Sequence, residues 1–186
     1  MNTPAPTSPI SMRIDVSTFA QTSASLAGSD PLRHYLRLAA DLHGPLADGP
    51  DLDVNWAVRG ELVAHTGSKP QLWLHLELRA QLPMTCQRCL TQVLMPVALD
   101  NSYRFVADEA TAEAEDECEE DLLVLSKQFD LRELLEDELL LELPLVPKHD
   151  VCPGKVKLAS TDEDFKAALT QKPNAFAALG SLKKGS

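Results

Sequence analysis

Hydrophobic and polar residues alternate along three stretches of the chain, residues 52–59, 71–79 and 93–99. This period of two predicts β-strands, because successive side chains of a strand point to opposite faces of a sheet. Pro96 interrupts the third stretch, so we expect an edge strand or a bulge there. One apolar and one polar face on each strand is typical of an antiparallel sheet that is packed on one side only.

After Asp130 the spacing of the apolar residues changes to that of an α-helix. Asp130 is placed to cap the first turn, Glu133 is placed to complete a capping box, and Pro144 ends the helix. The residues expected to face the core are Leu131, Leu134, Leu135 and Leu139. The sequence therefore predicts a well-capped helix that is followed by a proline-bounded exit.

Weaker patterns predict secondary structure in three further stretches. Residues 10–19 suit a short extended segment and a helical turn, and residues 122–125 suit a short strand. A helix is expected over residues 30–42, with Pro31 in its first turn and Gly44 after its end.

These elements predict an α+β fold, a mostly antiparallel sheet packed on one face by a few helices. The single domain is expected to span residues 10–152, with an acidic loop at 107–121. Composition predicts a disordered N-terminal tail at residues 1–9. Residues 153–186 are expected to form a basic C-terminal tail that contains a short helix.

The net charge of −11 is concentrated in one part of the chain. Residues 108–142 hold 15 acidic side chains against Lys127 and Arg132, which gives −13. Residues 1–107 contribute −1 and residues 143–186 contribute +3. An acidic surface attracts basic partners and repels phosphate backbones, so this segment is expected to avoid naked RNA.

The chain shows neither a secretory leader nor an apolar run of the roughly 20 residues that cross a bilayer. With four cysteines and no leader, we expect a soluble, cytoplasmic protein that does not bind membranes. Phosphate-binding glycine loops, nucleophile elbows and metalloprotease helices are also missing from the sequence. We therefore expect no enzymatic activity, no catalytic residues and no small-molecule substrate.

Cys86 and Cys89 are separated by two residues in the turn between two predicted strands, and His149 and Cys152 have the same separation. Such pairs can share one tetrahedral ion, and together they would form a Cys3His zinc site. The favoured alternative is that the cysteines are small, partly buried residues without a metal. Cys118 fits neither pair.

Several residues are candidates for binding a partner. The acidic helix offers Glu133, Glu136, Asp137 and Glu138 to a basic protein, with a merely solvated helix face as the alternative. Arg88 is a candidate for phosphate contacts, as are Arg79 and Arg104. Phe176 lies in the expected terminal helix, which either docks on a partner or folds back on the chain's own core.

Three blocks of the sequence resemble the YceD family, the bacterial large ribosomal RNA subunit accumulation proteins. They are Cys86-Gln87-Arg88-Cys89, the run from Asp130 to Cys152, and the tail from Lys172 to Lys183. The blocks lie in the family's order, and the resemblance extends from roughly residue 10 onward.

The resemblance implies a non-enzymatic role in the synthesis, processing or stability of large-subunit (23S) ribosomal RNA. Together with the acidic segment, it leads us to expect a factor that acts through a ribosomal protein or a large-subunit assembly intermediate. Direct binding of ribosomal RNA is one alternative, and a small zinc or thiol regulatory protein is another.

Overall fold

The computed structural model describes residues 12–44, 52–64, 67, 69–115, 117–154, 160, 162, 164 and 165. The chain divides into two units, Met1–His149 and Asp150–Ser186. The sheet and the helices described below belong to the first unit. Within the described ranges, no helix is both long and apolar enough to cross a membrane.

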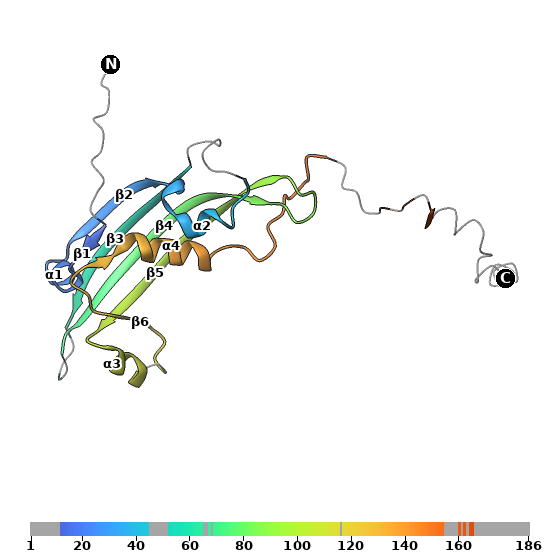
Figure 1. Cartoon of the computed structure of the whole chain (residues 1–186). Coiled ribbons are helices and arrows are strands. Elements are labelled where there is room, and N and C mark those ends of the chain that lie inside the picture. The colour runs from blue at the N-terminus through green and yellow to red at the C-terminus, as the bar shows by residue number, and fades with distance from the viewer. Residues whose placement is uncertain are drawn as a thin grey trace, which may run out of the picture. The chain divides into compact units, whose positions relative to one another are not determined.

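Five strands form the main sheet of the first unit, in the order β2-β3-β4-β5-β6 (Figure 1). They are β2 (Ser25–Pro31), β3 (Asp53–Val63), β4 (Gln71–Thr85), β5 (Gln92–Val106) and β6 (Asp121–Val124). All neighbouring pairs are antiparallel except β5 and β6, which are parallel. A second, two-stranded sheet pairs β1 (Arg13–Ile14) with β7 (Phe129–Asp130). The predicted mostly antiparallel sheet is confirmed.

The long hairpin of β4 and β5 keeps one register from the Leu72–Phe105 pair to the Thr85–Gln92 pair. Pro96 lies opposite Gln81 within this register, so the strand contains no bulge there. Strand β6 pairs only with Tyr103–Val106, which leaves the other end of β5 at the edge of the described sheet. The edge position predicted for Pro96 is therefore confirmed, because proline removes a donor that no neighbouring strand needs.

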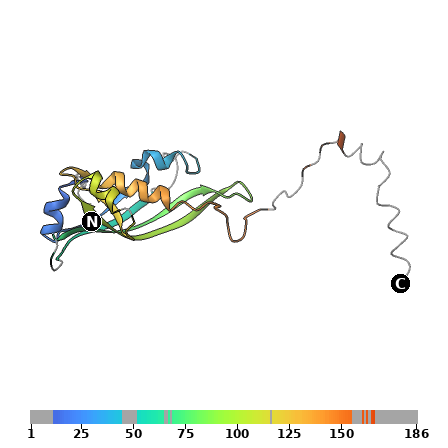
Figure 2. The ribbon, with the colours of Figure 1, turned by 90° about the horizontal axis from the view of Figure 1, so that it is seen from below.

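One face of the sheet is buried and the other is open. The alternating residues of β3 and β4 that point to the buried face include Val54, Trp56, Val58, Leu74, Leu76 and Leu78. Helices α2 (Leu36–Ala39) and α4 (Leu131–Leu141) lie over this face (Figure 2). The sequence pattern predicts this one-sided packing, because only every second side chain of each strand is apolar.

Helix α1 (Val16–Gln21) lies directly against the backbone of β3. It begins at Asp15, whose Oδ1 accepts the Thr18 N–H at 3.2 Å. A Cβ atom at Gly60 would lie 2.7 Å from the carbonyl oxygen of Phe19 and 2.8 Å from Cα of Ala20. Glycine at this position therefore lets the helix and the strand approach each other backbone to backbone.

Helix α4 has the predicted cap and the predicted apolar face. Asp130 Oδ1 accepts the N–H groups of Arg132 and Glu133 at 3.0 and 3.4 Å. The four predicted leucines are all buried; they are Leu131, Leu134, Leu135 and Leu139.

A carboxylate of α4 also caps the short helix α2. Glu136 Oε1 accepts the N–H of Arg37 at 2.6 Å and the N–H of Leu38 at 3.2 Å. The Arg37 guanidinium also forms two ion pairs, with Glu136 Oε2 at 3.0 Å and with Asp137 Oδ1 at 2.6 Å. Because α2 has only four residues and no side-chain cap from its own N-cap residue, it depends on this distant glutamate.

Two sequence-based predictions need correction. The helix expected over residues 30–42 is mostly absent, because Asp30 and Pro31 end strand β2 and a 3-10 turn (Leu32–His34) separates them from α2. Backbone pairing of Asp30 with Val54 overrides the local helix signal. The acidic loop at 107–121 contains the helix α3 (Glu109–Ala114), which begins because Asp108 Oδ1 accepts the Thr111 N–H at 2.8 Å.

We expect Gly60→Ala to lower the free energy of unfolding by about 1–3 kcal/mol, because the added methyl group would lie less than 3.0 Å from backbone atoms of α1 and force the backbone to shift. Urea denaturation of both proteins measures this difference. Gly154→Ala is the matched control, since a Cβ there meets nothing within 4 Å. Equal stability of the two variants would contradict the close contact between α1 and β3.

Candidate metal centre

The turn between β4 and β5 carries the first cysteine pair. Cys86 N–H donates to Thr91 O at 2.9 Å, which adds one more pair of residues to the β4–β5 hairpin. Leu90 N–H donates to Cys86 O at 2.9 Å and closes the turn. Leu90 has a φ of 61°, a left-handed conformation that is costly for a branched side chain. This tight turn brings Cys86 and Cys89 close together.

The segment that follows α4 runs beside this turn. Gln87 N–H donates to Pro147 O at 2.9 Å, and the Arg88 guanidinium donates to the carbonyl oxygen of His149. Nδ1 of His149 consequently lies 3.4 Å from Sγ of Cys89. These backbone contacts have no signal in the sequence, because they depend on how the proline-bounded exit folds back onto the hairpin.

The structure brings together the four predicted metal ligands. The ligand atoms of the set lie within 4.8 Å of one another and belong to Cys86, Cys89, His149 and Cys152. In a tetrahedral zinc site with Zn–S bonds near 2.3 Å, ligand atoms are about 3.8 Å apart, so small side-chain movements would close this cluster around an ion. Three thiols and one imidazole are a common donor set for structural zinc.

Hydrogen bonds in the cluster favour the thiolate that a metal needs. Burial alone would raise the pKa of the Cys86 thiol, but backbone N–H groups, foremost that of His149, outweigh burial and lower this pKa to about 5. The hydrogen bond with Cys86 raises the pKa of His149, against the opposing effect of burial. The cluster can therefore hold a negatively charged sulfur at neutral pH, which is the form that binds zinc.

Cys118 lies apart from this cluster, as predicted. Its sulfur is 3.6 Å from Nη2 of Arg104 and 3.4 Å from the carbonyl oxygen of Glu120. The same arginine pairs with Glu115 at 2.7 Å and with Glu120 at 3.7 Å. Arg104, a predicted phosphate contact, is therefore buried and held by the chain's own carboxylates.

The four acidic residues predicted to bind a partner have different environments. Glu133 is exposed, and Asp137 is half-buried and paired with Arg37. Glu136 and Glu138 are buried, so the alternative of a merely solvated helix face is wrong for both. Glu136 caps α2, while a hydrogen bond to Glu138 adds to burial in raising the pKa of the Tyr103 hydroxyl.

The other residues predicted to bind a partner also lie in different places. Arg88 is exposed and donates to the carbonyl oxygen of His149, so it helps to position a residue of the candidate metal centre. Arg79 is exposed on the open face of the sheet. Phe176 lies outside the described residues.

Comparison with known proteins identifies the family. A family model described as "Large ribosomal RNA subunit accumulation protein YceD" matches residues 74–183. The match covers more than half of the chain and includes most of the β4–β5 hairpin, all of α4 and all four candidate metal ligands. No solved structure matches the chain. The family match agrees with the three sequence blocks described above, and the chain belongs to the YceD family.

Proposed function

We propose that this protein is a non-enzymatic factor that supports the accumulation of large-subunit (23S) ribosomal RNA by binding a basic protein. The partner would be a ribosomal protein or a large-subunit assembly intermediate. Membership in a family named for this accumulation is the observation that carries the proposal. Ribosomal RNA would then be affected indirectly, through the assembly of the subunit.

Exposed carboxylates around α3 support a basic partner. Four glutamates among them form no ion pair within the described part of the chain; they are Glu109, Glu113, Glu117 and Glu119. Glu115 and Glu120 both pair with Arg104, whose single positive charge offsets only one of the two carboxylates. We call the four unpaired residues the α3 carboxylates. Such a surface accelerates the encounter with a cationic protein and disfavours phosphate backbones.

A hydrogen-bonded array on the open face of the sheet has the residue types of a catalytic triad, and we propose that it is not catalytic. Ring nitrogens of His75 lie 2.8 Å from Ser102 Oγ and 2.8 Å from Glu61 Oε2. Acyl transfer also needs N–H donors for the oxyanion, commonly including that of the nucleophile. The Ser102 N–H is already bonded to Asn101 Oδ1 at 3.0 Å. The array therefore fits a cross-strand surface network better than an active site.

Zinc is the second part of the proposal. An ion held by Cys86, Cys89, His149 and Cys152 would cross-link the β4–β5 turn to the segment that leaves α4. A closed set of four protein ligands leaves no position for a substrate, so the role of the metal would be structural.

We expect the purified protein to contain about one zinc ion per chain, as four-ligand sites do. Cys89→Ser should lose most of this zinc and melt at a lower temperature, because a hydroxyl is a poor replacement for a thiolate ligand. Metal analysis by mass spectrometry and thermal melts with and without a chelator measure both effects. Cys118→Ser is the control that keeps its zinc. A metal-free protein whose melting temperature zinc does not change would refute the site.

We expect deletion of the gene to lower the ratio of large-subunit to small-subunit ribosomal RNA and the large-subunit peak in a sucrose gradient. The wild-type gene should restore both. The double variant Glu113→Lys/Glu117→Lys should restore less, because it reverses two α3 carboxylates that face solvent.

Glu77→Lys/Asp100→Lys is the matched control, since it changes the net charge equally at a cross-strand pair on the open face of the sheet. Normal ribosomal RNA ratios in the deletion strain would overturn the proposed function. Equal complementation by the two double variants would rule out the α3 carboxylates as the partner surface.

A further inference from the structure

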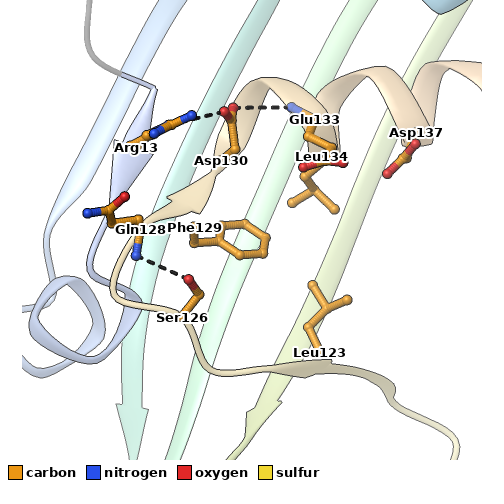
Figure 3. Close-up of a pocket in the computed structure, with 9 residues that line it drawn as sticks. All are labelled: Arg13, Leu123, Ser126, Gln128, Phe129, Asp130, Glu133, Leu134 and Asp137. Atoms are coloured by element: carbon orange, nitrogen blue, oxygen red, sulfur yellow. Dashed lines mark hydrogen bonds and ion pairs between the residues drawn. The ribbon is translucent and has the colours of Figure 1, made fainter. Parts of the chain in front are cut away.

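A groove of about 520 Å³ lies beside the first turns of α4 (Figure 3). The helix forms one side, and strand β7 with the segment that precedes it forms the other. This groove is separate from both the metal centre and the α3 carboxylates, because it shares no lining residue with them.

The floor of the groove is apolar and firmly placed. Phe129 lies between Leu134 and Leu123 (Figure 3). The Phe129 ring packs edge-on against Phe105, with centroids 5.2 Å apart and planes at 86°. Phe129 and Leu123 are only half-buried, so apolar surface remains available to a bound side chain. A floor that is held in this way can receive a ligand without first rearranging.

The rim of the groove is acidic. Its carboxylates come from Asp130, Glu133 and Asp137, against Arg13 as the one cationic side chain in the lining. Arg13 is 3.5 Å from Asp130, and Asp137 is paired with Arg37 outside the groove. The Glu133 carboxylate is exposed and has no ion-pair partner among the residues that the structure describes. The charge at the mouth is therefore negative and is not fully compensated.

We infer that this groove binds a cationic peptide segment of the partner protein, with an apolar side chain on the floor and a Lys or Arg beside Glu133. Charge complementarity selects this occupant, because phosphate groups would be repelled by the same rim. A purely apolar ligand would leave the Glu133 carboxylate uncompensated at the edge of its site. The inference rests on the proposed function for the basic character of the partner, and it adds the place where a short segment of that partner binds.

Titration of the full-length protein with a fluorescein-labelled peptide of Lys, Arg and one central Leu tests the groove. We expect Glu133→Gln to weaken binding. Glu133→Lys should weaken it more, by about three- to tenfold relative to the wild-type protein. The peptide with Ser in place of Leu should bind the wild-type protein more weakly, because it leaves the floor empty. Binding should decrease steeply as the salt concentration rises toward about 1 M.

Glu77→Gln and Glu77→Lys are the matched controls, because they make the same charge changes at an exposed glutamate of the open sheet face. Equal effects at Glu77 and Glu133, or no effect of the Leu to Ser change, would contradict peptide binding in the groove. Displacement of the peptide by a short single-stranded RNA would also overturn it. A dimer in sedimentation that Glu133→Lys disrupts would place a second copy there and overturn it too.

The two proposals can fail separately. A deletion strain with normal ribosomal RNA would contradict the proposed function, whatever the peptide does in solution. If the peptide does not bind but the deletion strain loses large-subunit RNA, peptide binding in the groove is refuted and the proposed function is not.

Discussion

The uninterrupted pairing of β4 with β5 is the constraint on which the rest of the first unit depends. From Leu72–Phe105 to Thr85–Gln92 every residue has one fixed partner. A slip by one residue would turn the buried leucines of β4 toward solvent, because successive side chains alternate between the two faces. The same slip would dismantle the turn that brings Cys86 and Cys89 together. Core packing and the candidate metal centre therefore both depend on one set of backbone hydrogen bonds.

The acidic residues of the chain have two distinct roles. Glu136 and Glu138 are buried, where Glu136 satisfies two backbone N–H groups of α2 and Glu138 interacts with Tyr103. The α3 carboxylates and Glu133 remain exposed and are available to a partner. Buried charges need compensating hydrogen bonds, whereas exposed charges can attract an oppositely charged partner over a longer distance. Charge reversal at Glu136 would therefore damage the fold before it reported on any partner.

Much of the fold could be predicted from the sequence, because alternation in the strands and the capped apolar stripe of α4 are local signals. The candidate metal ligands were also predictable, as two pairs with short spacings that could share one ion, although only the fold shows that the two pairs lie close together. The environment of Glu136 was not predictable, since its partner Arg37 is 99 residues away in the chain. Residues 30–42 were mistaken for a helix because strand pairing with β3 overrode the local propensity. The groove beside α4 gave no sequence signal, since its floor joins β6, β7 and α4.

The capping of α2 by Glu136 has a consequence for the biosynthesis of the protein. A four-residue helix has almost no stability by itself, and its cap is 99 residues further along the chain. At about 5–20 residues per second, translation supplies that glutamate roughly 5–20 s after Arg37 has been added. During this interval the strands of the N-terminal part of the nascent chain can pair, but α2 has no cap and does not yet form a stable helix over the sheet. The last step in closing this domain must therefore wait until α4 has emerged from the ribosome.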